Sequence, residues 1–133
     1  MKMEGVVLIC DGVPDTQNET INQNGVSFSK EIPVTYGQDE SFGKSVLYWE
    51  GNKLVAKIVL SNPFPKLENS EKLIKILSSR LIPSVCGAIY NRDPLDHNVI
   101  TKCVITCISL HLTPNADRRI TSLKECTDEN GSQ

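Results

Sequence analysis

FGKSVLYW-EGN-KLVAKIVL, residues 42–60, decides the fold of this chain. Both apolar runs are rich in residues that favour strands, and Gly51 between them can take the positive φ that a tight turn needs. The stretch therefore predicts a β-hairpin, with Phe42–Trp49 and Lys53–Leu60 as its two strands. In the second strand, alternate side chains share a face. The face that we expect to point to the core carries Leu54, Ala56, Ile58 and Leu60.

Further strands are predicted on both sides of the hairpin, each from a short apolar or alternating run. They are Gly5–Cys10, Ile32–Tyr36, Val85–Tyr90 and Val99–Leu112. One principal helix is predicted at about Glu71–Leu81, where leucine and isoleucine recur at helical spacing before Pro83 ends the pattern. We therefore expect one domain over residues 1–127, of the α+β class and mainly β. A polar tail at 128–133 is expected to be disordered.

Composition and charge argue against several classes of protein. The chain has 133 residues, a net charge of −2 and a pI near 5.7, whereas a nucleic-acid binder usually presents a basic face. Its apolar runs are far shorter than the roughly 20 residues that a membrane-spanning helix needs. The apolar run before Asp11 is too short for a signal peptide. We therefore expect a chain that is made and kept in the cytoplasm, with neither membrane nor nucleic acid as a partner.

Residues that bind metals or cofactors form no familiar pattern. No glycine-rich phosphate loop occurs. His97 lies with two aspartates in NRDPLDHN (91–98), and residues 11–19 carry three carboxylates, but we interpret both segments as solvated loops. Cys103 and Cys107 would share a face of a strand at a separation of roughly 13 Å, too far apart for one zinc ion. We expect no cofactor and no metal, with the cysteines acting as small apolar side chains in a reducing compartment.

A hydrolase site would need a nucleophile beside a base and an orienting group. The candidate nucleophiles are Ser84 and Cys86, which follow the predicted helix. The candidate base is His111, near the end of the last long strand. Cys86 and His111 would be neighbours if their strands paired in a suitable register, so this alternative stays open. Local sequence connects none of these groups, and it therefore favours a structural or binding protein over an enzyme.

Several blocks of the sequence follow one another in an order that resembles one family. GVVLICDGVPDTQNETI (5–21) resembles the opening of phage prohead proteases, including the XkdF-like group, which begin with a strand and a loop of the type VPDxQGExI. VTYGQDESFGKS (34–45) resembles the strand, His-Asp pair and Gly-Lys entry that follow. IPSVCG (82–87) is similar to the strand that carries the family's nucleophile, and SLHLTPNAD (109–117) resembles its closing SLVxxPxNPxA. The resemblance implies a compact β-barrel with flanking helices, shared with herpesvirus assemblins, and serine endoproteolysis of scaffold and capsid proteins.

The three catalytic positions that the resemblance identifies are all occupied by other residues. Gln38 stands where the family has its histidine, and a neutral amide cannot take a proton from a nucleophile. Cys86, or Val85 if the register shifts by one, stands at the serine. The orienting residue falls near Cys107. Loss of the base alone lowers the rate by orders of magnitude, so the resemblance implies a fold that is kept for another use.

The resemblance therefore implies a non-catalytic phage head protein: an auxiliary or decoration protein of the capsid, or a head assembly factor. Its partners would be the major capsid protein and other head proteins, its location would be the virion, and a homo-oligomer on the capsid would fit. Two alternatives stay open. One is an active maturation protease that uses Cys86 or Ser84 with His111, and the other is a small adaptor domain without a viral connection.

Overall fold

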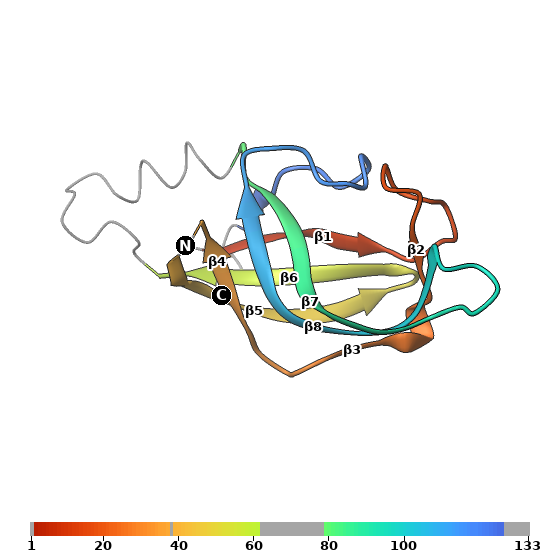
Figure 1. The fold of residues 1–133 in the computed structure, drawn as a ribbon. Coiled ribbons are helices and arrows are strands. Elements are labelled where there is room, and N and C mark those ends of the chain that lie inside the picture. Colours follow the sequence, from red (N-terminus) through yellow and green to blue (C-terminus); the bar gives the residue numbers. More distant parts are fainter. Residues whose placement is uncertain (1, 38, 62–78, 127–133) are drawn as a thin grey trace.

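The computed structural model describes residues 2–37, 39–61 and 79–126, and it places their strands in one mixed β-sheet (Figure 1). The strands run in the order β2-β8-β4-β5-β6-β1-β9, while β3 and β7 also pair with β8. A short 3₁₀ helix, η1 (Gln23–Gly25), precedes β3. The strands are β1 (Lys2–Ile9), β2 (Thr20–Ile21), β3 (Val26–Phe28), β4 (Ile32–Tyr36), β5 (Asp39–Glu50), β6 (Lys53–Leu60), β7 (Ile82–Arg92), β8 (Val99–His111) and β9 (Lys124–Glu125).

The hairpin predicted from residues 42–60 is confirmed as β5 and β6. The two strands pair antiparallel from Gly43 opposite Leu60 to Glu50 opposite Lys53, and Gly51 in the turn has a φ of 64°. The face expected to point to the core is buried along the whole of β6. The other four predicted strands correspond to β1, β4, β7 and β8. Local alternation and turn chemistry were therefore sufficient to find the longer strands.

The predicted α+β class is wrong, because the regular structure of the described residues is almost entirely β-strand and includes no α-helix. Of the predicted helix Glu71–Leu81, residues 71–78 lie outside the described residues, as does the predicted tail at 128–133. Ser79 and Arg80 form a turn, and Leu81 is a buried coil residue that leads directly into β7. The apolar spacing that indicated a helix thus ends on a side chain that belongs to the core beneath the sheet.

The predicted compact β-barrel is also not formed. β1 and β7 approach each other, but within the described residues no ladder of hydrogen bonds pairs them. The segment after β8 explains the gap. The Leu123 N–H donates to the Leu81 carbonyl at 3.1 Å, and the Leu123 side chain lies against β1, where a Cβ on Gly5 would be 2.9 Å from it. This segment separates the two strands that would have to meet to close a barrel.

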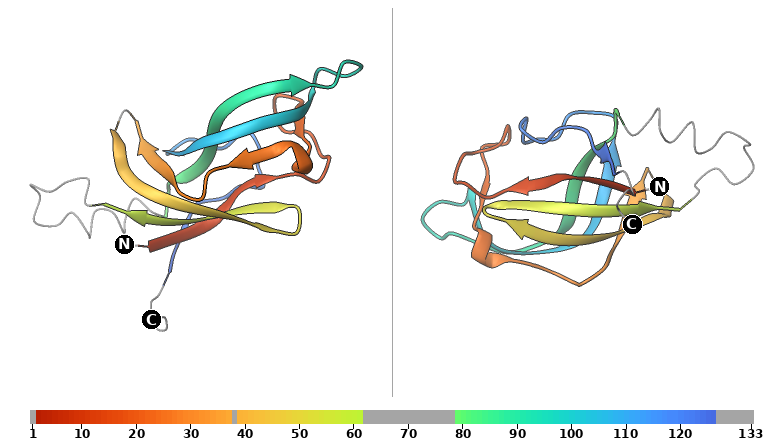
Figure 2. Two further views of the ribbon diagram at one scale, coloured as in Figure 1. Left: turned by 90° about the horizontal axis from the view of Figure 1, so that it is seen from below. Right: turned by 180° about the vertical axis from the view of Figure 1, so that it is seen from behind.

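The open sheet is bent over on itself, as Figure 2 shows, with β7 and β8 on one side and β1, β5 and β6 on the other. The core fills the inside of the bend. Its fully buried side chains come from both sides and include Met3, Leu54, Ile58, Ile108 and Leu110. Burying one such side chain contributes about 1.5–3 kcal/mol, so the two sides of the sheet hold each other together through this contact.

Three short strands run parallel to β8, one after another. Thr20 lies opposite Val99, Val26 opposite Cys103 and Val34 opposite Ile108. Between the first two strands the chain passes so close to β8 that a Cβ on residue 25, a glycine, would lie 1.8 Å from the carbonyl oxygen of Thr101. A side chain does not fit there, and glycine allows this approach.

The set of alternate β8 side chains that points toward the core changes at Thr106. Thr106 has no partner in β7, because Cys86 pairs with Cys107 and the next residue of β7, Gly87, pairs with Ile105. One extra residue in one strand is a β-bulge, and it shifts the alternation of the side chains. Cys103 and Cys107, which we expected on one face, therefore lie on opposite faces. The buried residues on either side of the bulge are Cys103 and Ile105 before it, and Ile108 and Leu110 after it.

Candidate functional site

The residues singled out from the sequence lie on β7 and β8, which run side by side (Figure 1). Cys86 is directly opposite Cys107, and Ser84 is opposite Ser109. Because side chains alternate along a strand, these four share the face that points away from the core. The intervening Val85 packs against the core instead. The structure thus brings Cys86 and Cys107 together, while the third expected position, Gln38, lies outside the described residues.

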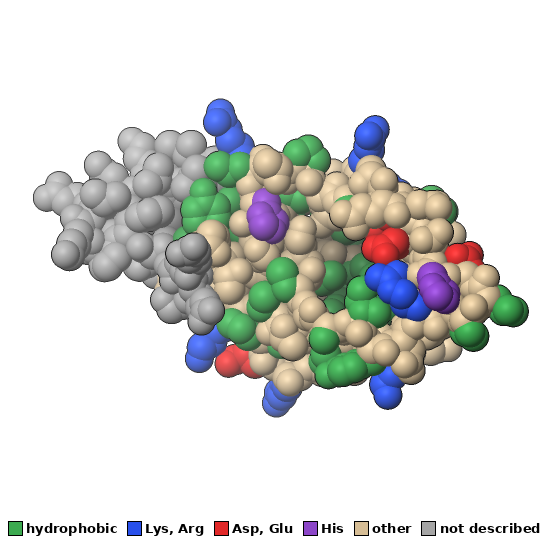
Figure 3. Space-filling view, in the orientation of Figure 1, with side chains coloured by type: hydrophobic (Ala, Val, Ile, Leu, Met, Phe, Trp, Pro, Cys, Tyr) green, Lys and Arg blue, Asp and Glu red, His purple; other side chains and the backbone are tan. Residues whose placement is uncertain are grey.

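The two histidines of the chain lie far from these cysteines. His111 is opposite Ile82 at the end of β8, so four residues of strand, roughly 13 Å, separate it from the Cys86–Cys107 pair. His97 lies in the turn at the other end of the hairpin, and Figure 3 shows the two histidines well apart. Within the described residues, no hydrogen bond joins His111 to Cys86 or Ser84. The proposed pairing of Cys86 with His111 is therefore not formed.

Ser84 lies nearer to His111 and is held by a different neighbour. The two residues are diagonal neighbours across the strands, which places such residues about 7–8 Å apart. The Asn115 side-chain amide donates to the Ser84 hydroxyl at 2.9 Å and to the Pro83 carbonyl at 2.7 Å. The Asn115 side-chain oxygen in turn accepts the Asp117 N–H at 2.9 Å. Ser84 therefore tethers the segment after β8 to the start of β7.

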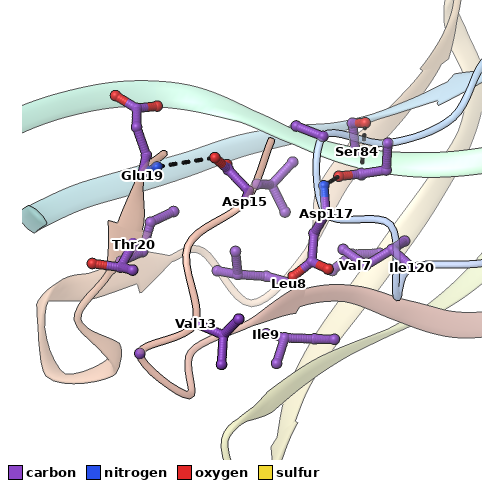
Figure 4. A pocket seen from close by; sticks show the side chains of 15 residues that line it. Val7, Leu8, Ile9, Val13, Asp15, Glu19, Thr20, Ser84, Asp117 and Ile120 are labelled. Carbon is purple, nitrogen blue, oxygen red and sulfur yellow. Dashed lines mark hydrogen bonds between the residues drawn. The ribbon is translucent and has the colours of Figure 1, made fainter. Parts of the chain in front are cut away.

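Ser84 also lines a cavity between β1, the loop after β1, the start of β7 and the segment after β8 (Figure 4). Its volume is about 190 Å³, below the roughly 300–1,000 Å³ of common small-molecule sites. The lining is mixed: its apolar residues include Val7, Leu8, Ile9, Val85 and Ile120, and its polar ones include Asp15, Glu19, Ser84, Asn115 and Asp117. A cavity of this size suits a few water molecules or one inserted side chain.

The loop after β1 is organised by Asp15. The Asp15 carboxylate accepts the N–H groups of Gln17 at 2.8 Å and Glu19 at 3.0 Å (Figure 4 shows the second). Between them, Asn18 has a φ of 61°, a left-handed conformation that only glycine and a few polar residues adopt readily. The Thr16 N–H donates to the Ala116 carbonyl at 3.0 Å, which joins this loop to the segment after β8. Asp15 thus holds its own loop in shape.

Arg119 also joins the loop after β1 to the segment after β8. Its guanidinium binds Asp117 through two nitrogens, at 3.0 and 2.9 Å, and also binds Asp11 of the loop after β1. The hydrogen bonds from Arg119 hold the pKa values of Asp11 and Asp117 below their usual range. The carboxylates in this region therefore have protein partners, and they close two loops against each other.

The remaining ionisable candidates have similar local roles. Asp93 and Asp96 accept N–H groups two residues further along, at 2.8 and 3.1 Å, in the turn between β7 and β8. The described residues contain no group of three side chains that could hold a metal ion. Burial is the main cause that raises the pKa of the Cys103 thiol, and it raises the pKa of Cys10 to about 11, with the nearby Cys103 and Asp11 contributing.

Sequence reasoning missed Asn115 and Arg119, which connect the site to the rest of the fold. Asn115 and Asp117 each accept the N–H group two residues further on, a turn pattern that PNAD (114–117) allows one to expect. The long-range partner of Asn115 is Ser84 and that of Arg119 is Asp11, and both partners are distant in sequence. No local pattern identifies such partners.

Comparisons with protein-family models, with curated proteins and with solved structures find no match for this chain. Where the structure describes the chain, no helix has the length and apolar character needed to span a membrane.

Proposed function

We propose that this chain is a non-catalytic protein of a phage head, an auxiliary or decoration protein of the capsid or an assembly factor, which binds the major capsid protein. The observation that carries the proposal is the pair Cys86 and Cys107. The two residues stand where the proteases that this chain resembles carry the nucleophile and the orienting residue, and they face each other across β7 and β8. A thiol opposite a thiol supplies neither an imidazole nor a carboxylate to activate a nucleophile.

The loop after β1 supports the resemblance on which this proposal rests. The protease pattern VPDxQGExI has glycine at the position of Asn18, and Asn18 has the positive φ of 61° that glycine takes without strain. Asp15, which matches the aspartate of the pattern, accepts the N–H groups that hold the turn. The pattern is therefore explained here by loop geometry, which a non-catalytic relative would need as much as an enzyme.

The end of the β7–β8 hairpin offers the contact surface that we assign to the capsid. Three large apolar side chains are exposed there: Ile89 by 49%, Tyr90 by 63% and Leu95 by 96%. The hairpin extends beyond the body of the sheet, as the left view of Figure 2 shows. Exposed apolar side chains that gather on a projecting element are typical of protein–protein contacts. We therefore place the capsid contact at this end of the molecule.

Analysis of purified phage heads tests the proposal. We expect the chain in purified proheads or virions in a fixed ratio to the major capsid protein. Replacing Tyr90 and Leu95 by serine removes two apolar contacts of about 1.5 kcal/mol or more each, so binding to heads should weaken on the order of 100-fold. The control is Val59→Ser, because Val59 is 53% exposed on another strand, β6. Absence of the chain from heads at every stage would refute the proposal, and equal binding by the double variant would refute the assigned surface.

The alternative of an active maturation protease rests on Ser84, which lines the cavity and is a diagonal neighbour of His111. The test is coexpression of the chain with the capsid and scaffold proteins, together with the variants Ser84→Ala, Cys86→Ala and His111→Ala. We expect no cleavage in any of them. Cleavage by the natural chain that disappears in Ser84→Ala or Cys86→Ala would establish the protease in place of the binding protein.

A further inference from the structure

Cys86 and Cys107 are directly opposite each other in an antiparallel pair of strands, and both are half-buried on the outward face. We propose that these two residues form a reversible disulfide that links β7 to β8. The inference concerns these two thiols alone and does not depend on the proposed role in a phage head. The two cysteines would be a redox modification site, at the positions where the proteases that this chain resembles carry catalytic residues.

The geometry of the ladder suits the bond. Directly opposite residues of an antiparallel pair have Cα atoms about 4.5 or 5.5 Å apart, depending on the hydrogen-bonding pattern. Both values lie within the roughly 4.4–6.8 Å that disulfides span. The bulge at Thr106 lies directly beside the pair and shifts the alternation of β8, so that the Cys107 side chain lies on the same outward face as Cys86. Because the bond lies on the outward face, its formation leaves the packing of Val85 and Ile108 in the core unchanged.

The other cysteines are less suited to the reaction. Cys10 and Cys103 lie near enough to interact electrostatically, but burial raises the pKa of each thiol, and the thiolate is the species that attacks a disulfide. Cys126 lies beyond β9 at the opposite end of the sheet, where its N–H donates to the Lys2 carbonyl. Cys86 and Cys107 are therefore selected by their position, directly opposite each other across two paired strands.

The oxidant is a low-molecular-weight disulfide such as oxidised glutathione. The thiolate of one cysteine attacks a glutathione sulfur, forms a mixed disulfide and releases one glutathione thiolate. The thiolate of the second cysteine then attacks the protein sulfur of the mixed disulfide and releases the second glutathione. In total the two protein thiols lose two protons and two electrons, and one oxidised glutathione becomes two reduced molecules. Excess reduced glutathione reverses the exchange.

The bond would restrain the hairpin that carries the exposed apolar side chains. It closes the chain from residue 86 to residue 107, which includes the whole turn between β7 and β8. A cross-link of this kind restricts the unfolded chain and so favours the folded one. The reduced form would exist in a reducing cytoplasm and the oxidised form outside the cell. The redox state would thus set how firmly the two strands are held together.

The test uses the full chain, reduced and then equilibrated with mixtures of oxidised and reduced glutathione, followed by peptide mapping with mass spectrometry. We expect one intramolecular cross-link between the peptides that contain Cys86 and Cys107, with the loss of two hydrogens. Thermal unfolding of the oxidised chain should have a higher midpoint than that of the reduced chain. Both effects should vanish in Cys86→Ser and in Cys107→Ser, and both should persist in the matched control Cys126→Ser.

Several outcomes would overturn the proposal. One is a chain that stays reduced, or carries only glutathione adducts, even without added reduced glutathione. Another is a cross-link between Cys10 and Cys103, or one formed only between two molecules. Peptide mapping of the natural chain and of Cys126→Ser decides the matter even if a variant at position 86 or 107 does not fold. None of these results bears on binding to phage heads, which is tested separately.

Discussion

Gly25→Ala is the substitution that tests the fold most directly. A Cβ at this position would lie 1.8 Å from the Thr101 carbonyl oxygen and 3.1 Å from the Lys102 Cα, both backbone atoms of β8. The φ of Gly25 lies outside the left-handed region, so the backbone itself accepts alanine. In the absence of the clash, Gly→Ala would stabilise the chain by about 0.4–1 kcal/mol. Any destabilisation therefore reports the close approach of the two segments.

The magnitude follows from what must move. To relieve the overlap, the chain at 20–25 has to withdraw from β8, which weakens the hydrogen bonds from Thr20 N–H to Asn98 and from Asn22 N–H to Ile100, of 3.0 and 2.9 Å. Two such bonds contribute about 0.5–1.5 kcal/mol each, and overpacking adds about 1–3 kcal/mol. With the backbone gain of about 0.4–1 kcal/mol subtracted, we expect a net loss of about 1–6 kcal/mol in the free energy of unfolding, centred near about 3 kcal/mol.

Urea unfolding followed by tryptophan fluorescence measures this loss. The chain has one tryptophan, Trp49, whose ring centroid lies 6.5 Å from that of Phe28 in β3. With a loss of about 3 kcal/mol and a slope of about 2 kcal/mol per molar urea, in the middle of the usual range, the midpoint should fall by about 1.5 M. The control is Gly51→Ala, where a Cβ meets nothing within 4 Å but φ is +64°, so the strain of about 1–2 kcal/mol is in the backbone alone. An unchanged or raised midpoint for Gly25→Ala would show that the chain at 20–25 does not pack against β8 as described.

Three further substitutions test the loops and the outer face of the sheet. Asn18→Ala should lower the free energy of unfolding by about 1 kcal/mol, because alanine resists a φ of 61°, while Asn18→Gly should leave it nearly unchanged; urea midpoints of both variants decide this. The carboxylates that Arg119 binds have lowered pKa values. Their contribution to folding stability is therefore present above the unfolded-state pKa, about 4, and is lost as the pH falls below it. Arg119→Gln should accordingly show a smaller loss of thermal stability below about pH 4 than the natural chain. The hydrogen bond to Glu4 raises the pKa of Tyr48 to about 12 from 10.0, so its stabilisation is complete below pH 10 and lost as the pH rises through about 12. Tyrosinate absorbance should show this late titration, which Glu4→Gln should move earlier, and an unchanged curve in that variant would remove the assigned cause.

Much of the sheet can be predicted from the sequence, because its longer strands carry local signals. The hairpin of β5 and β6 has alternation in both strands and a glycine in the turn. The run IPVTY predicts a strand at Ile32–Tyr36, and these are the bounds of β4. β2, β3 and β9 are two or three residues long and form only because β8 or β1 lies beside them. Segments of that length have too few side chains for any periodicity to show.

The sequence names residues of the candidate site, but it does not show which of them lie side by side. Ser84 and Cys86, the two candidate nucleophiles, both lie on β7, and Cys86 lies opposite Cys107, the position that the resemblance assigns to the orienting residue. The pairing of Cys86 with His111 failed because it depends on register, which a single strand does not specify. Asn115, which holds Ser84, escaped notice for the same reason, since its partner lies on a strand that is distant in sequence.

The bulge at Thr106 connects the core of the sheet to the pair of thiols on its surface. In an uninterrupted strand, Cys107 would keep the inward phase of Cys103, and Ile108 would turn toward solvent. The extra residue reverses this phase, so Ile108 is buried and Cys107 is turned outward opposite Cys86. The same irregularity that keeps both halves of β8 packed against the core therefore places the two thiols together outside it. A redox bond at this position is compatible with the fold because the core does not have to open for the bond to form or break.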